Sequence, residues 1–267
     1  MMQQMLVGMG FKFNGSTETY STSGTFTDTV PAGATSVTVK AWGAGGESSR
    51  AGTGGHVEGT ISVSGGDTIN VYVGAHDGGS PSSSVSLTNG GGLSGVKYGS
   101  NILIAGGGGG EGGPGAGGAG GGGNGPGGGF NGVGDFPGES GTQSEGGEGT
   151  IGDPVSGGDG SSWNNGANLV NGGAGGGSTG GSGNRSGGGG AGYFGGGGGG
   201  GGGGDFSGDG SGSGGGGGSG FISANWTSTV SVQGVMGPAS ARDSGDANYV
   251  SGRGGSDQDG LVVLIYS

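Results

Sequence analysis

Residues 106–129 read GGGGGEGGPGAGGAGGGGNGPGGG, and residues 195–204 are ten consecutive glycines. Glycine supplies 91 of the 267 residues, and 62 of those 91 fall within residues 106–220. Because glycine inside a helix costs about 1 kcal/mol relative to alanine, this stretch is not helical. A collagen triple helix is excluded as well, since the chain has only 7 prolines and no strict Gly-X-Y register.

The glycine-rich stretch requires a structure that offsets its large loss of backbone entropy. Glycine accepts an extended threefold helix whose N–H and C=O groups point sideways, so several such helices can bond laterally. Positions 112, 115, 118, 121 and 127 are all glycine, with Asn124 the one exception in this series. We therefore predict a bundle of polyglycine II rods over residues 106–220, with Gly195–Gly204 as an interior rod, in preference to a flexible linker.

The flanking segments have the composition of a β domain. Only 9 of the 41 Leu, Ile, Val and Phe residues lie within 106–220, so the flanks can bury a modest core. Val37, Val39 and Ala41 alternate with polar residues, as in a half-buried strand. Predicted strands are Thr25–Val30, Val37–Trp42, His56–Val63, Thr68–Val73, Asn101–Ala105, Phe221-Ile222, Trp226–Val232 and Leu261–Tyr266.

These strands predict an all-β fold, a jelly-roll-like sandwich with essentially no α-helix. Residues 25–105 and 221–267 are expected to form the sandwich, with 106–220 as a large insertion between them. Residues 1–24 are expected to supply an N-terminal docking segment and the first strand. Within this segment, the apolar residues either dock onto a larger particle or tuck into the protein's own sheet. They are Met5, Leu6, Val7, Phe11 and Phe13.

Charge and cysteine content exclude several classes of protein. The net charge is −12, and the seven Lys and Arg residues are scattered singly, so no basic stripe could neutralise nucleic-acid phosphates. Zero cysteine rules out disulfides, thiol catalysis and zinc sites built from cysteine. Leu261–Tyr266 is the longest apolar run and is too short to span a membrane, and we expect no signal peptide.

Catalytic motifs are matched only by chance, so we expect neither an enzyme nor a cofactor. G-x-G-x-x-G recurs without a helix, and the Gly-Lys pair of a phosphate-binding loop does not occur. His56 and His76 are expected to be ordinary strand or surface residues. Residues 257–260, Asp-Gln-Asp-Gly, match part of a calcium loop. A turn is the expected structure there, and a bound calcium ion stays an open alternative.

Aromatic residues between the glycine tracts are the positive functional signal. They are Phe130, Phe136, Trp163, Tyr193, Phe194 and Phe206, and Asn164 lies beside one of them. On exposed turns such side chains stack against sugars or fill pockets of a partner protein. The alternative is that they plug the ends of the glycine bundle. Nine carboxylates but only one cation, Arg185, fall within 106–220, so the tip of the bundle is expected to be acidic.

Residues 26–46, FTDTVPAGATSVTVKAWGAGG, resemble the opening of a glycine-rich domain found in bacteriophage virion and tail-fibre proteins. The matching parts are Val30-Pro31-Ala32-Gly33, the alternating valines, and the tract from Ala41 to Gly46. The final DGLVVLIY of residues 259–266 is similar to the closing strand of that family. Gln3-Gln4-Met5-Leu6 is similar to the start of marine phage virion proteins.

The resemblance implies a non-enzymatic virion protein of the tail or a fibre, made in the host cytoplasm. Its implied partners are other virion proteins and a host receptor, either a glycan or an outer-membrane protein, bound through a homo-oligomer. Two alternatives stay open. One is a purely structural head, tail or fibre decoration protein, and the other is an ice-binding or other extracellular glycine-rich structural protein.

Overall fold

The computed structural model describes twelve stretches of the chain. They are residues 13–77, 89–112, 117–118, 120–121, 138–142, 144–149, 154–155, 187–196, 198–199, 201–202, 213–237 and 239–267. Within them the chain is all-β and forms two five-stranded antiparallel sheets packed as a sandwich. None of these residues is helical, so the expected all-β sandwich is confirmed.

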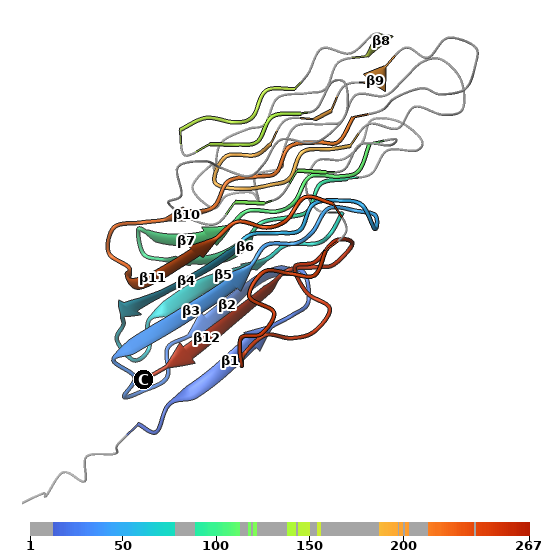
Figure 1. Cartoon of the computed structure of the whole chain (residues 1–267). Coiled ribbons are helices and arrows are strands. Elements are labelled where there is room, and N and C mark those ends of the chain that lie inside the picture. The colour runs from blue at the N-terminus through green and yellow to red at the C-terminus, as the bar shows by residue number, and fades with distance from the viewer. Residues whose placement is uncertain are drawn as a thin grey trace, which may run out of the picture.

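Each sheet joins strands from both ends of the chain (Figure 1). The first sheet has the order β1 (Ser16–Tyr20), β12 (Leu261–Tyr266), β3 (Ser36–Trp42), β4 (His56–Ser62), β11 (Thr227–Val232). The second sheet has the order β10 (Phe221–Ile222), β7 (Asn101–Ala105), β6 (Ser94–Tyr98), β5 (Thr68–Val73), β2 (Gly24–Thr29). A separate short pair consists of β8 (Pro154–Val155) and β9 (Gly201–Gly202).

The core between the sheets follows the predicted alternation. Val37, Val39 and Ala41 of β3 are fully buried in it, and across the sandwich β3 faces β6, whose Val96 is buried in the same core. Strand β1 lies within residues 1–24, where a first strand was expected. Strand β6 was not predicted, because its residues, SGVKY, are mostly polar or small. Pairing with β5 and β7 fixes it as a strand in the fold.

Two strands are buried on both faces. In β12, Val262 and Leu264 face the sandwich core, whereas Leu261 and Val263 pack with Trp42 under the segment of residues 237–260. In β7, Leu103 faces the same core and Ile104 faces outward, where it meets Leu93 and Ala191. Burial of Asn101–Ala105 on both faces was predicted from its continuous apolar run and is confirmed.

Strands of the sandwich continue directly into glycine-rich rods that run in the same direction (Figure 1). Strand β3 leads into residues 43–46, and β7 leads into residues 106–110. Residues 52–55, 89–92 and 213–220 likewise lead into strands β4, β6 and β10, respectively. The bundle therefore includes segments outside the expected range of 106–220 and is continuous with the sandwich.

The rod of residues 106–110 shows a three-residue hydrogen-bond period. Its N–H groups at 106 and 109 donate to residues 121 and 118, those at 107 and 110 donate to residues 191 and 188, and that at 108 donates to Ala44. Its carbonyls accept from three further rods, through residues 52 and 55, residues 215 and 218, and Gly91. One rod thus bonds to six neighbours, which is the lateral packing predicted for polyglycine II.

Glycine is required in this lattice because the backbones touch. A Cβ atom added to Gly108 would collide with the carbonyl oxygen of Gly52, and one on Gly107 would collide with that of Gly91. In the predicted rod of residues 195–204, the described N–H groups of Gly196 and Gly199 donate to Gly190 and Gly187, again three residues apart. No side chain larger than hydrogen fits between rods at these positions.

Candidate functional site

Polar side chains gather where several rods turn. We call this group the rim: Glu47, Ser48, Arg50, His76, Asp77, Glu111, Arg253, Asp257 and Asp259. Charged residues make up only 10% of the chain, so this concentration of charge at the ends of the rods is distinctive. The rim joins charged side chains from several rods and is the first candidate for a functional site.

His76 is the centre of one half of the rim. Its Nδ1 lies 2.9 Å from Oδ1 of Asp259, which also accepts the His76 backbone N–H at 3.0 Å, and Arg253 lies 4.0 Å from the same carboxylate. Burial alone would lower the pKa of His76, but Asp259, Asp77 and Asp257 raise it above its usual value. The ring is therefore stabilised as a cation, which makes His76 a poor general base.

Ser48 is the centre of the other half. Its hydroxyl donates to Glu111 at 2.5 Å, and its backbone N–H donates to Asp257 at 3.4 Å. Ser48 has φ +96° and Asp257 has φ +58°, values that residues with side chains rarely adopt. Strain of this kind persists only where surrounding contacts impose it and is concentrated at functional sites. A turn at residues 256–257 precedes β12, and the carboxylates of Asp257 and Asp259 bond to the chain itself.

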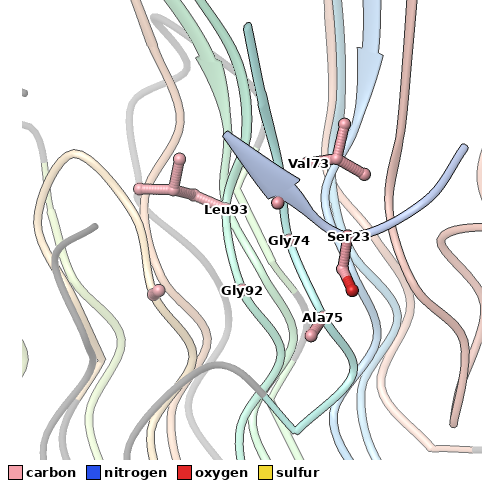
Figure 2. Close-up of a pocket in the computed structure, with 8 residues that line it drawn as sticks. Ser23, Val73, Gly74, Ala75, Gly92 and Leu93 are labelled. Atoms are coloured by element: carbon pink, nitrogen blue, oxygen red, sulfur yellow. The ribbon is translucent and has the colours of Figure 1, made fainter. Parts of the chain in front are cut away.

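A small apolar pocket lies where the second sheet meets the glycine rods (Figure 2). It has a volume of about 210 Å³ and is lined by Ser23, Gly24, Val73, Gly74, Ala75, Gly92, Leu93 and Ala191. Figure 2 shows Val73 and Leu93 on either side of Gly74. The backbone N–H of Gly74 donates to Ser94 Oγ, and that of Gly92 donates to Ala75. With these donors used internally, the pocket suits only a small apolar group.

Tyr193 and Phe194 are the predicted aromatic site residues that the structure describes. The Tyr193 ring stacks on Phe221 of β10, with ring centroids 4.0 Å apart and an angle of 12° between the rings. The Phe194 N–H donates to Ser219 Oγ, and both aromatic residues are half-buried. This pair joins a rod to the sandwich, as the plug alternative expects. Phe130, Phe136, Trp163, Asn164 and Phe206 lie outside the described residues.

Phe13 is the one described member of the predicted docking group. It is half-buried and packs against the sandwich core beside Gly33. Its position agrees with the alternative in which the apolar start tucks into the protein's own sandwich. Met5, Leu6, Val7 and Phe11 lie outside the described residues.

His56 is fully buried on the outer face of the first sheet, beneath the segment of residues 237–260. Its Nδ1 lies 3.6 Å from Asp243, and neither ring nitrogen has a hydrogen-bond partner among the described residues. Burial lowers the pKa of His56 to about 4, against the opposing effects of Asp243 and Asp246. Water does not reach the ring, so His56 is a structural residue, as expected.

Among the described residues, no group of three or more His, Asp or Glu side chains is arranged to hold a metal ion. The same part of the chain contains no helix long and apolar enough to cross a membrane. A comparison with protein-family models finds no match for the chain, and a comparison with curated proteins finds none either.

His76 and residues 257–260 were singled out from the sequence, but turns between rods were predicted only within residues 106–220, so the sequence did not predict that Glu47, Ser48 and Arg50 join them. A signal was present in residues 43–55, GAGGESSRAGTGG, where a short polar insert separates two glycine tracts. Such an insert marks the point where one rod ends and the next begins. Contacts between Ser48 and Glu111, or between His76 and Asp259, join residues far apart in the chain and needed the tertiary structure.

Proposed function

We propose that the chain is a non-enzymatic structural protein of a bacteriophage tail or fibre that presents loops to a host receptor. The β-sandwich anchors the protein to the particle, and the glycine bundle forms a stiff projection. Its partners are other virion proteins and a host surface glycan or outer-membrane protein. Several copies act together, because a multivalent assembly compensates for weak single contacts.

One observation carries this proposal: the sandwich strands run without interruption into rods that bond laterally to several neighbours. The residues 106–110 rod bonds to six others, so bending it would break hydrogen bonds on several sides at once. A tether of Gly and Ser would be flexible and would transmit neither position nor force. A stiff projection suits an attachment protein, which must hold its contact surface away from the particle.

Charge supports a binding role for the far end of the bundle. The described rods of residues 138–142 and 144–149 carry exposed glutamates at positions 139, 145 and 148. A protein with net charge −12 is repelled by acidic surfaces, so stable attachment requires specific contacts rather than general attraction. The aromatic inserts between the glycine tracts are the residues best able to make such contacts.

The test uses fluorescently labelled protein and a panel of bacterial cells. A variant with residues 130–137 and 156–170 replaced by short Gly-Ser turns is expected to lose cell binding. Residues 193–194 are kept, because Tyr193 stacks on Phe221 within the chain. The control variant Val230→Ser changes an exposed residue of β11 in the sandwich and is expected to bind as the parent does. Unchanged binding by the loop variant would overturn the attachment role, and electron microscopy of labelled particles would test the tail or fibre location.

A purely structural decoration protein is the second candidate, and the Tyr193–Phe221 stack favours it. The aromatic ring of Tyr193 stacks on Phe221 of the same chain, and the backbone N–H of Phe194 donates to Ser219 Oγ. Both contacts are internal to the protein. On this alternative, Tyr193→Ala lowers the melting temperature and leaves cell binding unchanged. On the attachment proposal, replacement of Phe130 and Trp163 abolishes binding at an unchanged melting temperature.

A further inference from the structure

Two rods form one border of the glycine bundle, residues 138–142 and residues 144–149 (Figure 1). The N–H groups of Gly138 and Gly141 donate to Gly214 and Gly217, three residues apart on an inner rod. The second rod donates inward from Gly147 to Gly195. Glu139 N–H donates to the Glu148 carbonyl and joins the two border rods to each other.

These border rods have two chemically distinct sides. Gly138, Gly141 and Gly147 are buried, and a Cβ atom on Gly141 or Gly147 would collide with a carbonyl oxygen of a neighbouring rod. The residues that follow Gly138 and Gly147 are Glu139 and Glu148, and both are exposed. Glu145, at the bend that begins the second rod, is exposed as well. Glycine therefore lies on the side facing the lattice, and glutamate lies on the side facing solvent.

A border rod resembles the edge strand of a β-sheet. An inner rod such as residues 106–110 exchanges hydrogen bonds with six neighbours, and the same geometry on an open side would accept another glycine rod. An edge of this kind is a template for pairing with another chain, and natural proteins protect edges with charged side chains. The exposed positions of the border rods are therefore where protection is needed.

We propose that Glu139, Glu145 and Glu148 end the glycine lattice and prevent a rod of a second copy of this chain from adding to it. A rod docked on this side would have to displace side chains where the lattice accepts only hydrogen. It would also bury carboxylates without partners, and the second copy carries the same net charge of −12. Any oligomer then forms through another surface.

The test compares the molar mass of two triple variants with that of the parent chain, by light scattering at equal concentration and physiological salt. Glu139→Gly, Glu145→Gly and Glu148→Gly together open the border, and we expect at least a twofold increase in mass. The matched control, Glu139→Asp, Glu145→Asp and Glu148→Asp, keeps a side chain and its negative charge at each position and is expected to retain the parent mass. A glycine variant with the parent mass, or an aspartate variant that also associates, would overturn the proposal.

Hydrogen exchange of residues 106–110 establishes that each variant keeps its lattice. If the triple glycine variant loses protection there, the double variant Glu139→Gly and Glu148→Gly decides the question, because it removes both exposed side chains that follow the inward-facing glycines and leaves Glu145 unchanged. Association of the folded double variant supports the proposal, and the parent mass contradicts it. These measurements do not involve host cells, so their outcome is independent of the proposed attachment function.

Discussion

The imidazole ring of His56 packs against the indole ring of Trp42, with ring centroids 4.5 Å apart and an angle of 30° between the rings. The two residues are direct cross-strand partners in β4 and β3. The segment of residues 237–260 covers both rings, and Trp42 Nε1 donates to the Arg242 carbonyl in that segment at 2.8 Å. This contact ties the covering segment to the first sheet and places a titratable group in a dry environment.

Acid is therefore expected to destabilise the fold through His56. Its folded pKa of about 4 lies below the usual histidine value of 6.5, so the unfolded chain binds a proton first as pH falls. The free energy of unfolding falls between pH 6.5 and 4, by up to about 3 kcal/mol at about 1.4 kcal/mol per pKa unit. Chemical denaturation at several pH values measures this fall in the free energy of unfolding. His56→Phe keeps a ring and should flatten the slope, and an unchanged slope in this variant contradicts the assignment.

His76 is expected to give stability the opposite dependence on pH. Although burial works against it, the Asp259 contact raises the folded pKa of His76 above its usual value. Its contribution to stability is fully present below pH 6.5 and is lost as pH rises through the folded pKa. Asp259→Asn should lower the imidazole pKa in an NMR titration. The control Asp77→Asn removes a smaller electrostatic contribution and should lower the pKa of His76 less. Equal pKa shifts in the two variants would show that Asp259 is not the main partner of His76.

Interior glycines of the lattice are expected to tolerate no side chain. Gly108→Ala places a methyl group against the Gly52 carbonyl and should lower the free energy of unfolding by about 3 kcal/mol or more. Gly245→Ala is the matched control, because a Cβ atom there meets nothing within 4 Å. The free energy of unfolding of Gly245→Ala should stay within about 1 kcal/mol of that of the parent chain. Equal melting curves for the two variants would contradict close packing of the rods.

The sandwich core is expected to show the ordinary cost of a cavity. Leu103 is fully buried between the sheets, so Leu103→Ala should destabilise the protein by about 2–5 kcal/mol. Val230, whose side chain is 39% exposed on β11, provides the control, and Val230→Ala should change stability by less than about 0.5 kcal/mol. Denaturant unfolding monitored by tryptophan fluorescence measures both. A small effect for Leu103→Ala would mean that the sheets do not pack through this residue.

Sequence patterns predicted the local structure of this protein well where one physical cause dominates. Alternating valines in residues 37–41 allow one face to be buried, and their strand is where it was predicted. Five glycines at 106–110 leave the lateral hydrogen-bonded helix as the only ordered option, and that packing is present. Strand β6 was missed because its conformation comes from its neighbours in the sheet.

The amino-acid sequence by itself determined that the protein is built from strands and threefold glycine helices, because glycine and β-branched residues restrict what each short segment can form. Only the tertiary structure decided that strand and rod are one continuous element, and that Ser48 meets Glu111 and His76 meets Asp259. It also decided that Tyr193 stacks on Phe221. Lateral hydrogen bonds between rods have the same geometry for any pair of glycine segments, so side chains at the turns and borders must select which rods become neighbours.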